Sequence, residues 1–185
     1  DKIWLKSYME GVPAEIDLNT YSSLADLLEQ GIAKDRDKVA YASMGIELTY
    51  ADVDRLSRDF AAWLQSVVKL PKGARVALMM PNTLQYPVCM FGVLRAGYVV
   101  VNVNPLYTPR ELEHQLKDSG ADVIVIMENF AATLEEVLDR TPVKHVVLTK
   151  MGDMLGGLKG GIVNFVVKYV KKLVPHYSLP KAVSL

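Results

Sequence analysis

The sequence predicts an α/β fold in which helices flank a parallel sheet. Helix and strand patterns alternate from residue 75 to residue 148, and the strand patterns are rich in β-branched residues. Strands that alternate with helices of about 10 to 15 residues pair in parallel through right-handed crossovers. The chain has 185 residues, of which 50% are hydrophobic, so it can bury a substantial core.

Two amphipathic helices and a hairpin are predicted before the sheet. After an irregular stretch at 1–21, residues 23–33 carry apolar side chains at helical spacing. These side chains are those of Leu24, Leu27, Leu28 and Ile32. Strands at 40–44 and 47–49 flank Gly45, which suits a tight turn.

A longer helix follows the hairpin. Thr49 is its expected N-cap, and the helix is predicted to run to about residue 68. Its expected apolar stripe consists of Val53, Leu56, Phe60, Leu64 and Val67. A turn at 71–73 then leads to a strand at 75–80.

A second helix and strand come next. Asn82 is predicted to cap this helix, because Gln85 stands three residues later as in a capping box. Gly97 ends the helix, since glycine accepts the left-handed conformation that a helix C-terminus often needs. Residues 98–103 are predicted as a strand, which the Asn-Pro pair at 104–105 terminates.

The following helix has clear signals at both ends. Thr108 is the expected N-cap, with Glu111 positioned to reach back to it. Pro109 occupies the first helical position, where its missing N–H is not needed. Gly120 is expected to end the helix in the left-handed conformation.

Two further strands complete the predicted sheet. Residues 122–127 are apolar almost throughout, as expected of a strand that is buried on both faces. Asn129 is predicted to cap a helix that leads to the last strand at 143–148. We therefore assign residues 1–150 to an α/β sheet subdomain and residues 151–185 to a separate C-terminal part.

The C-terminal part begins with a glycine-rich stretch. Residues 151–161 contain five glycines and are predicted to form a flexible surface loop. They depart from a phosphate-binding loop because Leu158 stands where that loop has its lysine. Residues 162–174 are predicted as a helix with an apolar side and a mainly basic side, followed by a linker.

This helix has two interpretations, and the sequence leaves both open. Its apolar side either packs on the core or docks on a membrane or a second subunit, as in a homodimer. The candidate membrane-contact residues are Phe165, Lys168, Lys171 and Lys172.

Four segments resemble the adenylate-forming enzymes, which include acyl-CoA synthetases, luciferases and peptide-synthetase adenylation domains. Residues 47–53 resemble the first core motif of this superfamily, and residues 91–102 resemble the second. Residues 102–116 and 164–169 are similar to the bacterial long-chain fatty-acid–CoA ligases in particular. The resemblance extends from about Trp4 to the last residue.

The resemblance implies a parent enzyme that uses Mg-ATP and coenzyme A. Such an enzyme converts a long-chain fatty acid to an acyl-adenylate and then transfers the acyl group to coenzyme A. The superfamily's Ser/Thr/Gly-rich phosphate loop, its ribose-binding Asp and its C-terminal Lys are absent from this sequence. We therefore expect an N-terminal fragment of the adenylate-forming fold that has no catalytic residue, binds no cofactor and is inactive alone.

The carboxyl ends of the predicted strands are where a ligand is expected. The residues there that could line an acyl groove are Asn82, Tyr86, Asn104 and Tyr107. Turn and cap roles explain both asparagines equally well.

Composition and residue patterns argue against a nucleic-acid partner, a metal site and a membrane-spanning helix. The formal net charge is +0 and no basic run is interleaved with aromatic residues, so we expect no nucleic-acid partner. Cys89 is a core residue by its apolar surroundings, and the isolated histidines predict no metal site. No apolar run reaches the roughly 20 residues that a membrane-spanning helix needs. We predict a cytoplasmic location. Peripheral contact with the inner face of the membrane is the open alternative. The rival interpretations are a free-standing doubly wound module that binds a small ligand, and an interaction module that uses the tail helix.

Overall fold

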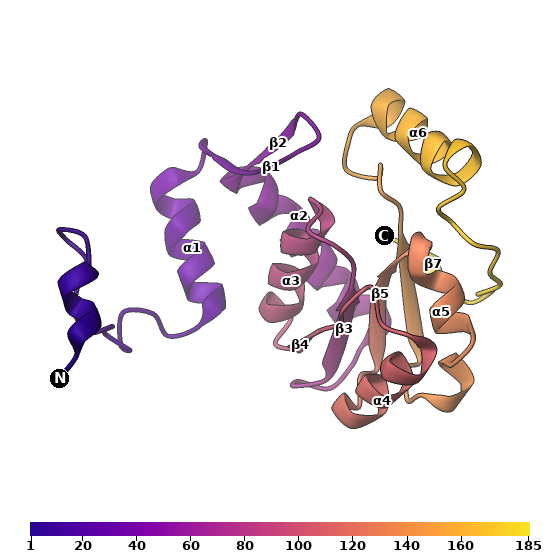
Figure 1. Cartoon of the computed structure of the whole chain (residues 1–185), viewed down its shortest axis with the longest axis horizontal. Helices are drawn as coiled ribbons and strands as arrows, with labels where there is room; N and C mark the ends of the chain where they lie inside the picture. The colour runs from indigo at the N-terminus through magenta and orange to yellow at the C-terminus, as the bar shows by residue number, and fades with distance from the viewer.

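A five-stranded sheet forms the centre of the computed structural model, which describes residues 1–185 (Figure 1). In chain order its strands are β3 (Arg75–Met79), β4 (Val99–Asn102), β5 (Val123–Met127), β6 (His145–Thr149) and β7 (Val183–Ser184). Across the sheet they lie in the order β4-β3-β5-β6-β7, and every neighbouring pair is parallel. The predicted parallel α/β fold is confirmed.

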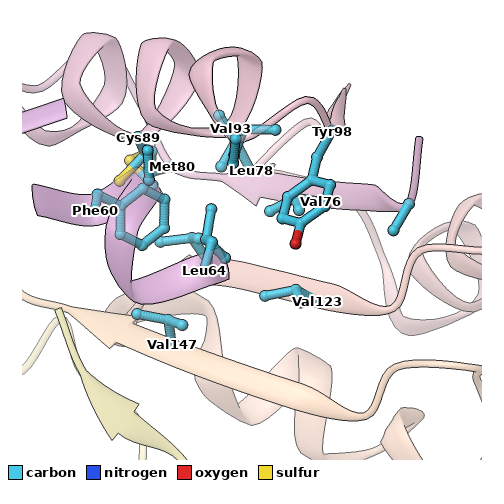
Figure 2. Packing of buried hydrophobic residues seen from close by; sticks show 14 of the residues in the cluster. Phe60, Leu64, Val76, Leu78, Met80, Cys89, Val93, Tyr98, Val123 and Val147 are labelled. Atoms are coloured by element: carbon cyan, nitrogen blue, oxygen red, sulfur yellow. The ribbon is translucent and has the colours of Figure 1, made fainter. Parts of the chain in front are cut away.

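Helices cover both faces of this sheet. They are α2 (Tyr50–Trp63), α3 (Gln85–Arg95), α4 (Pro109–Ser119) and α5 (Ala131–Glu135). One buried cluster joins the sheet to α2 and α3, and a second joins it to α4 and α5. Figure 2 shows the first cluster, in which Phe60 and Val93 of the helices pack with Val76 and Val123 of the strands.

Alternate residues of the central strands supply the two clusters. In β3, Val76 and Leu78 belong to the first cluster, whereas Ala77 and Met79 belong to the second. All residues of β5 are buried, which explains why its sequence is a continuous apolar run rather than an alternating one. Each large apolar side chain buried in this way contributes about 1.5–3 kcal/mol, so the two-sided sheet is the main source of stability.

The order of the strands creates a topological switch point. The chain passes from β3 to β4 through α3, and α4 then returns it past β3 to β5 on the opposite face. The direction of the connections therefore reverses between β3 and β5. Their carboxyl ends, after Met79 and Met127, mark the position at which open α/β sheets bind ligands.

The N-terminal elements lie to one side of the sheet. They are η1 (Ile3–Ser7), α1 (Leu24–Asp35), β1 (Val39–Ser43) and β2 (Ile46–Thr49). The predicted antiparallel hairpin is confirmed, and Met44 and Gly45 both have positive φ in its turn. The short 3-10 helix η1 buries no residue and projects away from the domain at the indigo end of Figure 1.

Helix α1 is attached by a small apolar contact and by ion pairs. It buries Leu28 and Ile32, whereas Leu24 and Leu27 of its predicted apolar face are exposed. Only the two deeper positions meet α2 and α3, because α1 packs at the edge of the domain.

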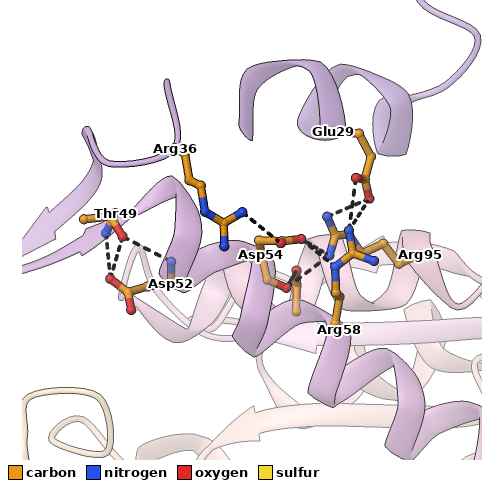
Figure 3. Close-up of polar contacts among 8 residues, drawn as sticks. Glu29, Arg36, Thr49, Asp52, Asp54, Arg58 and Arg95 are labelled. Atoms are coloured by element: carbon orange, nitrogen blue, oxygen red, sulfur yellow. Dashed lines mark hydrogen bonds and ion pairs between the residues drawn. The ribbon is translucent and has the colours of Figure 1, made fainter. Parts of the chain in front are cut away.

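The ion pairs converge on α3 (Figure 3). The side chain of Arg95 is 8% exposed, and its guanidinium lies 2.7 Å from the Asp54 carboxylate and 2.8 Å from that of Glu29. The same guanidinium donates to the backbone oxygen of Asp54 at 3.0 Å. Arg58 reaches the Asp54 carboxylate as well, at 2.7 Å. One buried arginine therefore links α1, α2 and α3.

The local end signals of two helices are confirmed. Thr49 and Thr108 each form a complete capping box with the acidic residue three positions later. Gly97 and Gly120 follow their helices with φ of 79° and 63°, in the left-handed region.

Three local predictions for residues 1–150 are wrong. The first concerns Asn82, because α3 begins at Gln85 after Leu84 and has no side-chain cap. The side chain of Gln85 is buried and donates instead to the backbone oxygen of Lys150 at 2.8 Å. A long-range hydrogen bond thus replaces the predicted local capping box.

The second concerns the helix after β5. It is divided into η3 (Glu128–Phe130), α5 and η4 (Leu138–Arg140), and Asn129 caps none of them. The Asn129 amide donates instead to the backbone oxygen of Leu173 at 3.0 Å. The third concerns Val67, which is 63% exposed. The π-helical turn η2 (Leu64–Val68) is wider than an α-helical turn and moves Val67 off the apolar stripe.

The glycine-rich stretch is also different from the prediction. Helix α6 (Gly157–Phe165) begins inside it and continues as the π-helical turn η5 (Val166–Val170). The backbone N–H of Gly152 donates to the side chain of Asn164 at 2.7 Å. The stretch is therefore a packed turn and a helix start, and the flexible-loop prediction is wrong.

The tail, predicted as a linker, ends in a strand. Val183 of β7 pairs with Val147 of β6, so the last residues extend the sheet. The division of the chain at residue 150 stays a prediction. None of the helices combines the length and the apolar character needed to cross a membrane.

Candidate functional site

Two of the four candidate acyl-groove residues lie together at the carboxyl end of β3. Asn82 and Tyr86 line a cavity of 340 Å³, and the Tyr86 hydroxyl lies 2.8 Å from the side-chain oxygen of Asn102. The other residues that line this cavity are Tyr41, Ala42, Ser43, Thr83, Leu84 and Pro87. The hairpin β1–β2 therefore forms one wall, which the sequence alone did not predict.

The other two candidates lie beyond β4 and do not reach this cavity. The side-chain oxygen of Asn104 accepts from the backbone N–H of Leu106 at 3.0 Å, which is a turn role. Tyr107 packs against the apolar cluster under α4. A single groove lined by all four residues stays a prediction.

The turn after β6 has the position of a phosphate-binding loop but a different chemistry. The Asp153 carboxylate accepts from the Thr149 hydroxyl at 3.1 Å and from the backbone N–H of Lys150 at 2.7 Å. The side-chain oxygen of Asn164 accepts from the backbone N–H of Gly152. Two backbone donors of the turn, those of Lys150 and Gly152, are already used, and a carboxylate lies beside them where a phosphate would have to bind. The turn therefore does not fit a nucleotide phosphate.

A buried carboxylate lies at the carboxyl end of β5. Glu128 follows the strand directly, is 2% exposed, and its Oε2 is buried without a hydrogen-bond partner. Burial raises the pKa of the Glu128 carboxyl above its ordinary range, and Asp153 adds to this effect. The charges of Lys150 and Lys168 and the hydroxyl of Tyr177 act in the opposite direction.

Its neighbour Asn129 is also incompletely satisfied. Because the Asn129 amide nitrogen donates to Leu173, the other amide atom must be the oxygen, and this oxygen is buried without a partner. Two unpartnered acceptors thus lie side by side in sequence at the switch point. The sequence carried one signal for them, a charged residue placed directly after a wholly apolar strand.

The predicted amphipathic helix presents apolar side chains to solvent. Phe165, Tyr169 and Leu173 are 58%, 61% and 57% exposed, so within this chain they do not pack on the sheet. The rings of Phe165 and Tyr169 lie 5.3 Å apart, and the Lys168 ammonium lies 5.8 Å from the centre of the Tyr169 ring. A basic and aromatic surface results. We call it the α6 face, since it starts at the last residue of α6 and continues through η5 to Leu173. It is defined by Phe165, Lys168, Tyr169, Lys171, Lys172 and Leu173.

A match to a family profile assigns the class of the protein. The profile of the AMP-binding enzyme family matches residues 28–177. The chain belongs to the AMP-binding enzyme family.

The similar proteins reported next are all long-chain-fatty-acid–CoA ligases. The chain is 60% identical to a long-chain-fatty-acid–CoA ligase of Escherichia coli over 183 residues, which cover 99% of this chain and 33% of the relative. It is 55% identical to that of Haemophilus influenzae, covering 100% of this chain and 33% of the relative. Among solved structures it is similar to a long-chain-fatty-acid–CoA ligase from Archaeoglobus fulgidus, with a TM-score of 0.65 and 24% identity over 84% of this chain and 32% of that one. The chain spans about a third of the length of the curated relatives that it matches.

Proposed function

We propose that this chain serves as the N-terminal part of a long-chain fatty-acid–CoA ligase. The observation that supports this most directly is the 60% identity to the Escherichia coli ligase over almost the whole chain. The proposed substrates of the complete enzyme are a long-chain fatty acid, Mg-ATP and coenzyme A, and its proposed location is the cytoplasm.

The role of this chain in that reaction is structural and substrate-related. Its glycine-rich turn does not fit a phosphate, so the nucleotide site is assigned to residues outside this chain. The sheet supplies a rigid two-sided scaffold, and Asn82 and Tyr86 supply polar groups at one carboxyl end. We propose that these two residues form part of the wall along which the acyl chain lies.

A chimera tests the proposed function. In it, this chain replaces the matching third of the Escherichia coli ligase, and acyl-CoA formation is measured from oleate, ATP and coenzyme A. We expect activity within about tenfold of the parent, because core substitutions that keep volume and pattern are well tolerated. This chain alone, assayed as the control, should form no acyl-CoA. A folded but inactive chimera, or turnover by the chain alone, would contradict the proposal.

We also propose that the α6 face docks on an anionic membrane. It combines exposed aromatic residues with three lysines, which is the composition of interfacial helices. Such docking would bring the enzyme to the surface from which a long-chain fatty acid is taken.

Vesicle sedimentation tests this docking. Each lysine near an anionic surface contributes about 1 kcal/mol, so changing Lys168, Lys171 and Lys172 together to Gln should weaken binding to phosphatidylglycerol vesicles by roughly 100-fold at low salt. The matched control changes three exposed lysines elsewhere, Lys34, Lys69 and Lys72, to Gln.

The control has the same net charge as the test variant, so it separates a local surface from a general attraction. Equal losses in the two variants, or binding that is indifferent to salt, would contradict docking through the α6 face. Self-association through this face without vesicle binding would favour the homodimer instead.

A further inference from the structure

The buried carboxyl of Glu128 lies beneath the C-terminal segment of the chain. We call residues 166–185 the strap, because they run from η5 past the carboxyl end of β5 to the sheet edge. Glu128 stands at the switch point, and the strap passes next to it there, at Leu173 and Tyr177. Tyr177, which interacts with the Glu128 carboxyl, and Leu173, which accepts from Asn129, both belong to the strap.

The middle of the strap is held mainly by polar contacts. Tyr169, Val170 and Leu173 are exposed, and the strap packs on the second buried cluster only from Leu179 onward, through Leu179 and Ala182. The hydrogen bond from Asn129 to Leu173 anchors the first half. At the far end, the backbone N–H of Leu185 donates to the oxygen of Leu148 at 2.9 Å. Residues 166–178 contribute to none of the buried clusters, so few apolar contacts oppose an opening of this part, which makes it a low-stability region.

The protonation state of Glu128 changes the energy of the closed strap. A buried carboxylate oxygen without a hydrogen-bond partner is unfavourable when it is ionised and acceptable when the group is neutral. The charged and titratable groups that face it are Lys150 and Asp153 from the turn after β6, and Lys168 and Tyr177 from the strap. The two lysines reduce the penalty but form no ion pair with Glu128.

We propose that Glu128 is a proton-controlled latch: the strap stays closed over the switch point while Glu128 is protonated and opens when Glu128 ionises. Opening lets water reach the carboxylate and frees the strap from its anchor at Asn129. The closed strap binds the proton more tightly than the open one. Closure is therefore most favourable at low pH, and it weakens as the pH rises above the ordinary range of a glutamate and through the raised pKa of Glu128 in the closed form.

The latch would regulate the α6 face, since Lys168, Lys171 and Leu173 belong to both. In this sense it rests on the proposed membrane docking. The latch can nevertheless be tested without lipid, so a failure of the latch and a failure of the docking are distinguishable.

Hydrogen exchange of the full 185-residue chain tests the latch. Amide exchange in residues 166–177 is compared between the native chain and Glu128→Gln at about pH 4, below the ordinary range of a glutamate, and at about pH 8. Comparison at equal pH removes the intrinsic pH dependence of exchange. Because Gln is neutral at both values, the native chain should exchange as slowly as the variant at the lower pH. At the higher pH it should exchange faster, by about tenfold for each unit by which closure raises the Glu128 pKa.

Helix α4 provides the internal reference, since its amides should exchange equally in both proteins at each pH. A native-to-variant ratio in the strap that is the same at both pH values would overturn the latch. Tyr177→Phe gives an independent test, because it removes the hydroxyl that favours the ionised carboxyl. It should speed strap exchange at the higher pH and leave it unchanged at the lower one, and an equal effect at both would also overturn the proposal.

Discussion

Arg95→Met should lower the free energy of unfolding by about 3 kcal/mol, because it removes the buried member of an ion-pair network. The Arg95 guanidinium contacts the carboxylates of Asp54 and Glu29 and the backbone of Asp54. Methionine retains much of the apolar stem but none of these contacts. The Asp54 side chain is only 14% exposed. Without Arg95 it keeps ion pairs only with Arg58 and Arg36, which are both exposed. Chemical denaturation followed by circular dichroism measures the change.

Arg36→Met is the matched control for this experiment. Arg36 lies 4.0 Å from the same Asp54 carboxylate, but its side chain is 62% exposed. Exposed ion pairs of this kind contribute about 0–1 kcal/mol. Both substitutions remove a positive charge from the same carboxylate, but only Arg95 is buried, in close contact with Asp54 and paired with Glu29 as well. Similar losses for both variants would show that Arg95 has no special role in joining α1 to α2 and α3.

The network also predicts a dependence on acid. Burial raises the pKa of Asp54, but hydrogen bonds and charges from Arg95 and Arg58 outweigh burial and hold this pKa below its ordinary range. A lowered pKa in the folded state stabilises the fold above the unfolded pKa, and this contribution is lost as the pH falls through the folded value. The native chain should therefore lose more stability than Arg95→Met in acid.

The sequence was sufficient where both partners of an interaction are neighbours in the chain. The capping boxes at Thr49 and Thr108 need a partner only three residues away, and Gly97 and Gly120 need only their own backbone conformation. The central strand β5 was also predictable from a continuous segment, because burial on two faces leaves an apolar run that no turn residue interrupts.

The two wrong capping predictions share a different cause. Gln85 and Asn129 have side chains suited to local capping, yet each bonds to a backbone oxygen 65 and 44 positions away. The first partner is Lys150, at the end of β6, and the second is Leu173, in the strap. Local pattern cannot show which of two hydrogen bonds is preferred, because the tertiary partner is supplied only once the chain has folded.

The candidate site was predictable in position but not in detail. The carboxyl ends of the strands follow from the parallel sheet, and Asn82 and Tyr86 do lie together there. The hairpin wall of their cavity and the covering of Glu128 depend on packing between distant segments. Neither leaves a periodic trace in the sequence.

Gly160→Ala should displace α6 and lower the free energy of unfolding by about 3 kcal/mol, at the upper end of the usual range for overpacking. A Cβ on Gly160 would lie 2.2 Å from the backbone oxygen of Gly152, and a backbone atom cannot move aside as a flexible side chain can. Gly161→Ala is the control from the same helix, since a Cβ there meets nothing within 4 Å. It should instead stabilise the chain by up to about 1 kcal/mol through helix propensity. Adding one methyl group is thus expected to lower the free energy of unfolding at Gly160 and to raise it at Gly161. Denaturation midpoints that shift in the same direction would contradict the close approach of the Gly160 and Gly152 backbones, which holds α6 in place.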